Sequence, residues 1–255
     1  MDSENNTPVP PVYTQPKSNP LVIPVAIVIG AGLIAAALFY GGTTSSTPAH
    51  NAQMPATDAP QEASTNGSIR PVDEDDHIRG NPNAPIVIVE YSDYDCPFCK
   101  SYHQTMNQIM DEYGASGQVA WVYRQFPLEQ LHPNAPTIAL ASECVADLAG
   151  NDAFWSFSDL VFEERERNTL TNITKLSSYA TLVGVNKDKF DTCMSEERFF
   201  GKVAEDSADA LTAGANGTPY SLVLVGGQQG VINGAQPYEA VQQIIETLLS
   251  QIQGS

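Results

Sequence analysis

Two cysteines separated by two residues, directly after an apolar run, constrain the fold of this chain most. The run 85–91 (PIVIVEY) predicts a buried strand, and the motif Cys96-Pro97-Phe98-Cys99 follows it at the start of a helical segment. This order places the sulfur of Cys96 at a helix N-terminus, where unpaired N–H groups and the helix dipole favour a thiolate. Pro97 suits the first helical position, because its missing N–H costs nothing there. A stabilised thiolate is a good leaving group, so the motif indicates dithiol–disulfide exchange.

Charge limits the kinds of partner that the chain is expected to bind. Its 255 residues carry 12 basic and 30 acidic side chains, a net charge of −18. From residue 71 onward there are 10 basic and 26 acidic side chains, so the acidity belongs to the folded part. Contact with nucleic-acid phosphates needs clustered Lys and Arg, so no nucleic-acid partner is expected. The composition favours a soluble acidic surface.

An uncharged apolar stretch near the N-terminus predicts a membrane anchor. Residues 21–40 (LVIPVAIVIGAGLIAAALFY) contain 20 uncharged positions, enough for a helix to span a hydrocarbon core of about 30 Å. The stretch is longer than a usual signal-peptide core and no convincing cleavage site follows it, although a removed signal peptide is the alternative. Lys17 precedes the stretch and the next basic residue is Arg70, which weakly places residues 1–20 in the cytoplasm. The rest of the chain is then exported.

The segments on either side of this stretch have a composition typical of disorder. Residues 1–20 and 41–76 are rich in Pro, Ser, Thr, Asn, Gln and Ala and poor in large apolar side chains. They cannot bury enough surface to offset the ordering entropy, which predicts a disordered tail and a flexible linker. The run Asp73-Glu74-Asp75-Asp76 is interpreted as solvated charge rather than as a cation site.

The chain from residue 77 to 252 alternates between strand and helix patterns. A strand at 85–91, a helix at 97–113 and a strand at 119–123 predict a βαβ unit with a parallel sheet. A mostly helical block at about 134–213 follows, with helices expected at 135–148, 154–162, 170–182, 186–199 and 203–213. The C-terminal part predicts a strand, a hairpin-type turn, a second strand and an amphipathic helix, at 220–225, 226–230, 231–232 and 238–252.

This order of elements resembles the thioredoxin fold with an inserted helical domain, and specifically the DsbA-type disulfide oxidoreductases. The resemblance covers residues 77–252, and the transmembrane helix precedes it. It is carried by RGNPNAPIVIVEYSDYDCPFCK at 79–100, by His132-Pro133, Cys144 and Phe154-Trp155 in the helical block, and by Gly217-Thr218-Pro219 at a strand start. The fold class is therefore α/β.

The resemblance implies roles for residues on both sides of the redox pair. Cys96 is expected to be the nucleophile of the reduced form and the attacked sulfur of the oxidised form, with Cys99 as the resolving partner. The proline corresponding to Pro219 is cis in that family and faces the disulfide. Thr218 would then offer backbone hydrogen bonds to an extended substrate, and Pro219 itself has no N–H.

Three further residues are expected to tune the site. Pro97 and Phe98 influence the redox poise. Phe98 stands where DsbA-type enzymes often carry His, and since Phe cannot donate a hydrogen bond to the thiolate, this departure speaks against strongly oxidising character. Glu90 corresponds to a buried acid that helps proton transfer, a role that desolvation of the carboxylate would suit. A strand-end Glu reaching solvent is the alternative.

The other two cysteines suggest a structural role. Cys144 and Cys193 both fall in the helical block, and we hypothesise a disulfide between two of its helices; two buried free thiols are the alternative. A structural zinc wants four ligands, and the chain has no second Cys-x-x-Cys and no paired His at finger spacing. No metal and no cofactor are therefore expected.

Together these features predict an exported, single-pass thiol–disulfide oxidoreductase whose catalytic domain is extracytoplasmic and forms disulfides in reduced exported proteins. The resemblance suggests a quinone-linked membrane oxidoreductase as its redox partner. A disulfide reductase or isomerase is the alternative within the same chemistry, because direction follows reduction potential and partner. A non-catalytic chaperone-type module on the same fold is the alternative from another class.

Overall fold

The computed structural model of the chain describes residues 69–166 and 168–254. The predicted tail at 1–20, the predicted transmembrane segment at 21–40 and most of the predicted linker at 41–76 lie outside the described residues. Within the described ranges, every helix is too short or too polar to cross a membrane.

A mixed five-stranded sheet forms the centre of the domain, in the order β1-β3-β2-β4-β5. Its strands are β1 (His77–Gly80), β2 (Ile86–Ser92), β3 (Val119–Gln125), β4 (Tyr220–Val225) and β5 (Gln228–Asn233). The pair β2–β3 is parallel, which confirms the predicted βαβ unit, and the other neighbours are antiparallel. Strand β1 was not predicted, because four residues are too few to show an alternating pattern and β1 is defined by its pairing with β3.

Helices surround the sheet and form the inserted block. They are α2 (Pro97–Ile109), which continues as a π-helical turn η1 (Met110–Gly114), then α3 (Ala135–Ala149), α4 (Asn151–Glu164), η2 (Ile173–Lys175), α5 (Leu176–Leu182), α6 (Lys187–Ser195), α7 (Phe200–Thr212) and α8 (Tyr238–Gln253). The helix predicted from residue 170 starts later, because the N–H of Thr171 donates to the Asp95 carboxylate and Asn172 caps the turn that follows. The helix predicted to reach residue 199 ends earlier, where Glu197 has a φ of 48°.

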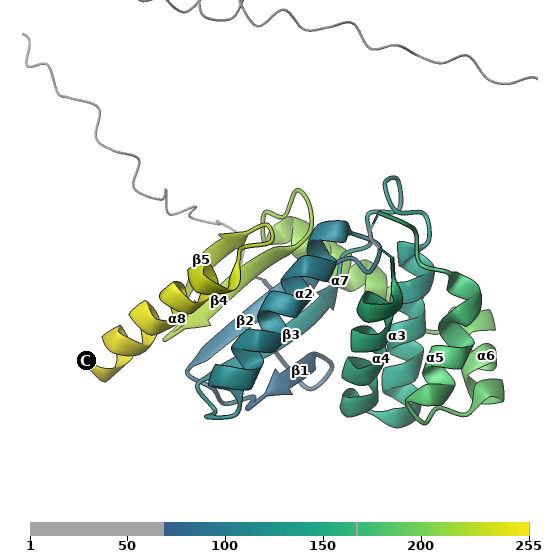
Figure 1. Cartoon of the computed structure of the whole chain (residues 1–255), viewed down its shortest axis with the longest axis horizontal. Helices are drawn as coiled ribbons and strands as arrows, with labels where there is room; N and C mark the ends of the chain where they lie inside the picture. The colour runs from purple at the N-terminus through teal and green to yellow at the C-terminus, as the bar shows by residue number, and fades with distance from the viewer. Residues whose placement is uncertain (1–68, 167, 255) are drawn as a thin grey trace, which may run out of the picture. The chain divides into compact units, whose positions relative to one another are not determined.

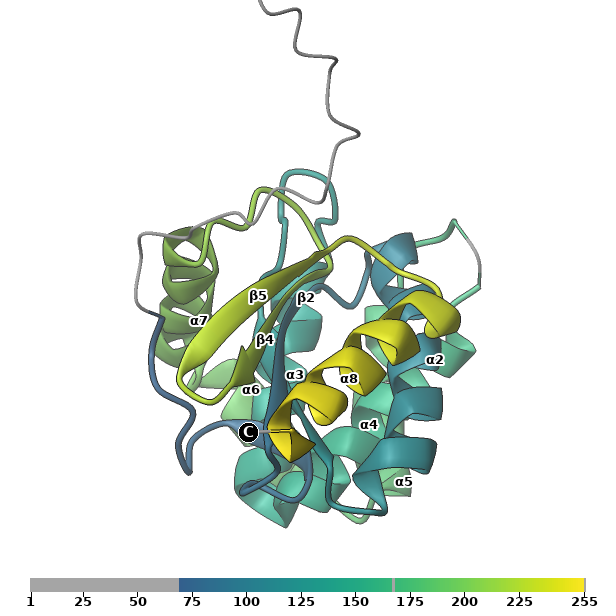
Figure 2. The ribbon, with the colours of Figure 1, turned by 90° about the vertical axis from the view of Figure 1, so that its left-hand side faces the viewer.

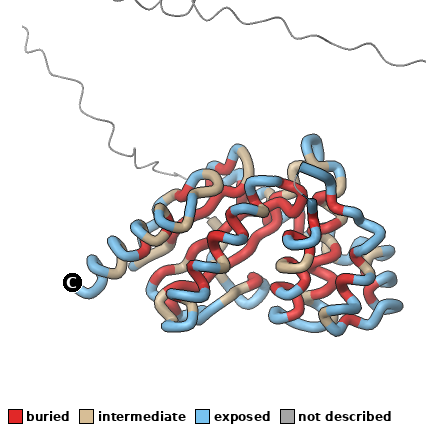
Figure 3. The backbone as a smooth tube through the Cα atoms, in the orientation of Figure 1, coloured by how far each residue is buried: buried red, intermediate tan, exposed pale blue. Residues whose placement is uncertain are grey.

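The two faces of the sheet are covered differently (Figures 1 and 2). Helices α2 and α8 cover one face and α7 covers the other, while α3 to α6 form a block beyond one edge. Successive residues of a strand point to opposite faces, so Ile86 and Ile88 of β2 join the cluster under α2 and α8, and Val89 and Tyr91 join the cluster under α7. The buried residues run through the sheet and into the helices that flank it (Figure 3). Glu90 therefore occupies the α2 face.

The segment before β1 packs on the domain, which corrects the predicted linker boundary. Arg124 of β3 is fully buried and its guanidinium pairs with Asp76 at 2.8 Å and with Asp209 at 2.6 Å. It also donates to the carbonyl oxygens of Arg70 and Pro71, each at 3.1 Å. The prediction of solvated charge is wrong for Asp76, because a buried arginine needs a buried carboxylate as its partner. Asp73, Glu74 and Asp75 are exposed, as predicted.

A disulfide joins two helices of the inserted block. Cys144 of α3 and Cys193 of α6 are bonded, with their Cα atoms 5.9 Å apart, and both residues are fully buried. The pairing hypothesised from the sequence is thus present, and it fixes α6 against α3.

Replacing both Cys144 and Cys193 by Ala should lower the free energy of unfolding by about 2–4 kcal/mol, because the bond closes a long loop in the unfolded chain. Denaturant unfolding followed by tryptophan fluorescence measures the change. The matched control replaces Ser195, an exposed serine at the end of α6, by Ala. An unfolding midpoint equal to that of the parent would contradict the prediction.

Candidate active site

The redox motif lies where the central strand β2 gives way to helix α2. Cys96 is the N-cap residue with extended backbone (φ −72°, ψ 124°), and Pro97 is the first helical residue. The carbonyl of Cys96 accepts the N–H of Lys100 at 3.2 Å, which closes the first helical turn. The amides of that turn therefore lie next to the Cys96 sulfur, as the sequence predicts. Cys96 and Cys99 are both free thiols, and Cys99 is the more deeply buried.

The segment before β4 completes the site from the other side. The Thr218–Pro219 peptide bond is cis, and the Cys96 thiol donates to the carbonyl oxygen of Thr218 at 3.4 Å. The structure thus brings together the two predicted halves, the dithiol and the Thr-Pro pair, across 122 positions of sequence. A backbone segment that presents hydrogen-bonding groups beside the reactive sulfur suits an extended polypeptide.

The two thiols have opposite electrostatic surroundings. A hydrogen bond from the Cys99 thiol, together with the backbone N–H groups of Cys99 and Phe98, lowers the pKa of Cys96 to about 6. Burial raises the pKa of Cys99 well above its ordinary value. The sulfur of Cys99 also accepts the N–H of Asp93 at 3.4 Å. The pair therefore divides into one sulfur ready to be a thiolate and one that keeps its proton.

Glu90 lies fully buried on the same face of β2, beneath the helix that carries the thiols. The indole N–H of Trp121 donates to one carboxylate oxygen at 2.9 Å, and the other oxygen has no hydrogen-bond partner among the described residues. Burial raises the pKa of Glu90 to about 7. The alternative of a strand-end Glu reaching solvent is wrong. A carboxyl group that titrates near neutrality can accept or return a proton at working pH.

Two aspartates that flank Tyr94 hold the loop before Cys96, and neither was predicted to belong to the site. The Asp93 carboxylate accepts the N–H of Leu128 at 2.7 Å and lies 2.9 Å from Nδ1 of His132. The Asp95 carboxylate accepts the N–H of Thr171 at 2.8 Å. Two carboxylates within three residues of a reactive cysteine were the available signal. Their partners are more than 30 residues away in sequence, so the signal alone could not assign a role.

The entrance to the site carries an exposed aromatic ring. Phe98 is 64% exposed, and Pro97 is exposed beside it. Next to them lies a hollow of about 350 Å³ whose lining residues are Pro97, Phe98, Lys100, Ser101, Gln104, Arg165 and Asn168. An exposed apolar side chain beside the reactive sulfur suits contact with unfolded chains, which expose apolar residues.

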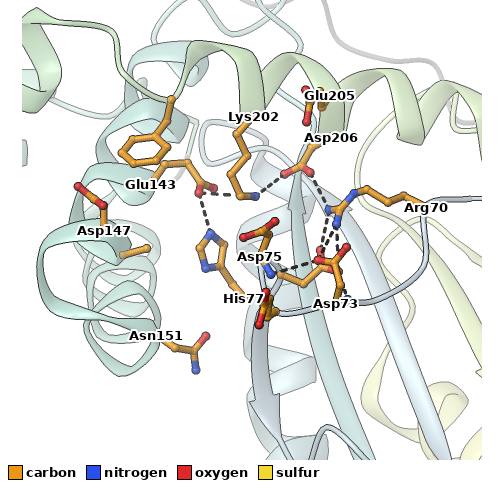
Figure 4. A pocket seen from close by; sticks show the side chains of 14 residues that line it. Arg70, Asp73, Asp75, His77, Glu143, Asp147, Asn151, Lys202, Glu205 and Asp206 are labelled. Carbon is orange, nitrogen blue, oxygen red and sulfur yellow. Dashed lines mark hydrogen bonds and ion pairs between the residues drawn. The ribbon is translucent and has the colours of Figure 1, made fainter.

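A second hollow, of about 510 Å³, lies away from the thiols between residues 70–77, α3 and α7 (Figure 4). Acidic side chains dominate its lining, and the cations that balance them are already paired. His77 points to Glu143 at 2.8 Å, and Lys202 lies between Glu143 and Asp206. Among residues 69–166 and 168–254, no group of three or more His, Cys, Asp or Glu side chains is arranged to hold a metal ion.

Comparison with known proteins identifies the family. A family profile described as "Thioredoxin" matches residues 72–247. In solved structures, BdbD of Bacillus subtilis is similar with a TM-score of 0.62 and 23% identity, over 72% of this chain and 98% of that one. The α-DsbA1 of Wolbachia pipientis has a TM-score of 0.60 and 22% identity, over 71% and 94%. These likenesses show the fold.

Part of the chain is also similar to longer curated proteins. The Na(+)/H(+) antiporter NhaA 1 of Mycolicibacterium gilvum is 33% identical over 158 residues, which cover 61% of this chain and 24% of that protein. NhaA 3 of Salinispora tropica is 31% identical over 154 residues, covering 60% and 22%. The chain thus spans about a quarter of the length of these relatives.

The fold and the site together define a thioredoxin-fold protein with a dithiol built for thiol–disulfide exchange. The chain belongs to the thioredoxin family, and its fold is the mixed α/β form with a helical insertion that DsbA-like structures share.

Alkylation of Cys96 should follow its lowered pKa. Because the pKa of Cys96 is about 6, its thiolate forms between pH 5 and 7. The rate of its reaction with iodoacetamide should rise over this range and then level off. Below this range the thiol is protonated and the rate falls. Mass spectrometry of the reduced protein measures the rate for each cysteine. A Cys96 midpoint near the ordinary thiol value of about 8.5 would contradict the assignment.

Changing Glu90 to Gln should slow the attack of Cys99 on a mixed disulfide at Cys96. Gln keeps a carbonyl for the Trp121 N–H but cannot take up a proton, so a loss of at least about tenfold at pH 7 is expected. Release of glutathione from the Cys96 mixed disulfide measures this step. The control is Ser221→Ala, because Ser221 of β4 is also buried and lies opposite Glu90 in the pair β2–β4. Equal rates for the Gln variant and the parent would rule out proton transfer by Glu90.

Proposed function

We propose that this protein is an exported, membrane-tethered thiol–disulfide oxidoreductase that forms disulfides in other exported proteins. The observation that carries the proposal is the asymmetry of the dithiol. Cys96 has a pKa lowered to about 6 and lies 3.4 Å from the Thr218 carbonyl, while Cys99 is buried with a raised pKa. Cys96 is the less buried of the two sulfurs, 3% exposed against 0% for Cys99, and it is the one that is stable as a leaving group. A structural neighbour, α-DsbA2 of Wolbachia pipientis, is described as a thiol–disulfide exchange protein.

The reaction begins with the oxidised pair. A substrate thiolate attacks Cys96, the Cys96–Cys99 bond breaks, and Cys99 leaves with the electron pair and takes up a proton. Glu90 is suited to supply that proton, because its carboxyl titrates near pH 7. A second substrate thiolate then attacks the substrate sulfur of the mixed disulfide and expels Cys96 as a thiolate. The substrate loses two electrons and the pair gains them.

The substrate is an extended, reduced polypeptide. Backbone groups at Thr218 and Pro219 would hold the segment around its cysteine, and the exposed ring of Phe98 would contact its apolar side chains. This recognition uses main chain and general apolarity, so it serves many sequences.

Membrane tethering through residues 21–40 would hold the domain in the same plane as a reoxidising partner. We propose a quinone-linked membrane oxidoreductase, because each turnover leaves two electrons on the pair. A tether raises the effective concentration of the two proteins. Attachment can be tested with the full chain, which should stay with membranes after washing in high salt, while a chain starting at residue 69 should not.

Equilibration with glutathione buffers measures the reduction potential of the pair. An oxidising potential is expected, because the lowered pKa of Cys96 stabilises the reduced form although the Phe98 side chain donates no hydrogen bond to the thiolate. A potential at the reducing end would overturn the oxidase assignment in favour of a reductase.

Cys96→Ala should abolish oxidative refolding of a reduced disulfide protein. Full activity of that variant would instead support a chaperone-type module that holds chains without redox chemistry.

A further inference from the structure

Arg165, at the C-terminal end of α4, reaches from the helical insertion into the redox site. It is 4% exposed, and its guanidinium donates to the carbonyl oxygen of Asp95 at 2.7 Å and to that of Cys96 at 3.1 Å. It also donates to the carbonyl of Thr169 at 3.2 Å. A full positive charge therefore lies against the backbone of the reactive cysteine, although the two residues are 69 positions apart.

The loop around Cys96 carries buried negative charge that needs such a cation. Asp93 and Asp95 are buried, and one oxygen of Asp95 has no hydrogen-bond partner among the described residues. Glu90 lies below the same sulfur. Like charges disfavour one another, so these carboxylates oppose a thiolate at Cys96. His132 faces Asp93 but contacts neither Asp95 nor Cys96 in the described hydrogen bonds.

The two residues between the cysteines supply no positive charge to the site. Phe98 occupies the position between the cysteines where an ionisable or hydrogen-bonding side chain could face the thiolate, and its ring is mostly exposed. The planar guanidinium of Arg165 instead keeps a positive charge within hydrogen-bond distance of three backbone carbonyl oxygens, those of Asp95, Cys96 and Thr169.

We propose that Arg165 is an electrostatic positioning residue of the redox site: it is the countercharge held against the backbone of Cys96, and it favours a thiolate there beside the buried carboxylates of Asp93 and Asp95. Lys100, the neighbouring cation, donates instead to the carbonyl oxygens of Glu163 and Arg165. The helical insertion thus contributes directly to the oxidising strength of the pair. This inference rests on the proposed thiol–disulfide function and adds a determinant that lies outside the motif.

The test compares Arg165→Gln with Arg165→Lys in the reduced protein. The Gln variant removes the charge, so the pKa of Cys96, followed by thiolate absorbance, should rise by about one unit. The equilibrium constant for oxidation of glutathione at pH 7 should fall about fivefold in consequence. The Lys variant keeps the charge and should recover most of both quantities.

A matched control loosens the segment around Thr171, which contacts the loop before Cys96 through Asp95, without changing charge. Asn134 donates to the carbonyl of Thr171 at 2.9 Å, so Asn134→Ala removes a neutral hold on this segment. It should leave the pKa of Cys96 and the glutathione equilibrium unchanged. An equal shift in this control would show that Arg165 acts only by ordering the loop, and would overturn the proposal.

Asp95→Asn provides a test in the opposite direction, which also serves if Arg165→Gln does not fold. Asn keeps an acceptor for the Thr171 N–H but removes the negative charge, so the pKa of Cys96 should fall and the equilibrium constant should rise. No change in either Asp95→Asn or a folded Arg165→Gln would overturn the proposal. Failure of the parent protein to exchange with glutathione at all would instead overturn the proposed function.

Discussion

The start of helix α2 is the constraint on which the chemistry of this protein depends. The chain leaves β2, turns at Cys96 with an extended backbone, and enters the helix at Pro97. The amides of the first turn have no helical partners, so the nearest anionic group that they can stabilise is the sulfur at the N-cap. The sheet fixes where this helix begins, and the segment before β4 fixes what faces it.

Burial then separates the two thiols that the helix carries. Cys99 lies one turn further on, against the face of the sheet that also holds Glu90, and loses contact with water there. Desolvation raises the pKa of Glu90 and of Cys99. At Cys96 hydrogen bonding outweighs desolvation and lowers the pKa of the thiol. One short motif therefore contains Cys96, which a substrate thiolate can attack, and Cys99, which can resolve the mixed disulfide from its buried position.

Local signals predicted much of this arrangement, and tertiary contacts account for the rest. The apolar run of β2, the Cys-Pro-x-Cys start of α2 and the amphipathic α8 are visible in short windows of sequence, and so is the Thr-Pro pair. The burial of Asp76 depends on Arg124, which lies 48 residues away. The contact of Arg165 with the Cys96 carbonyl arises where α4 ends beside α2. Periodicity within one segment carries no information on such pairs, since they form only when the sheet and the insertion pack.

The buried position of the Cys144–Cys193 bond affects how this bond meets reactive thiolates, including those of other copies of the protein. A protein that exchanges disulfides meets thiolates constantly, including the Cys96 thiolate of other copies. Exchange requires a nucleophile to approach a sulfur in line, and both sulfurs of this bond lie in the interior between α3 and α6. Burial of both sulfurs therefore shields the structural disulfide from thiolates outside the domain, and the scaffold is protected from the reaction that it supports.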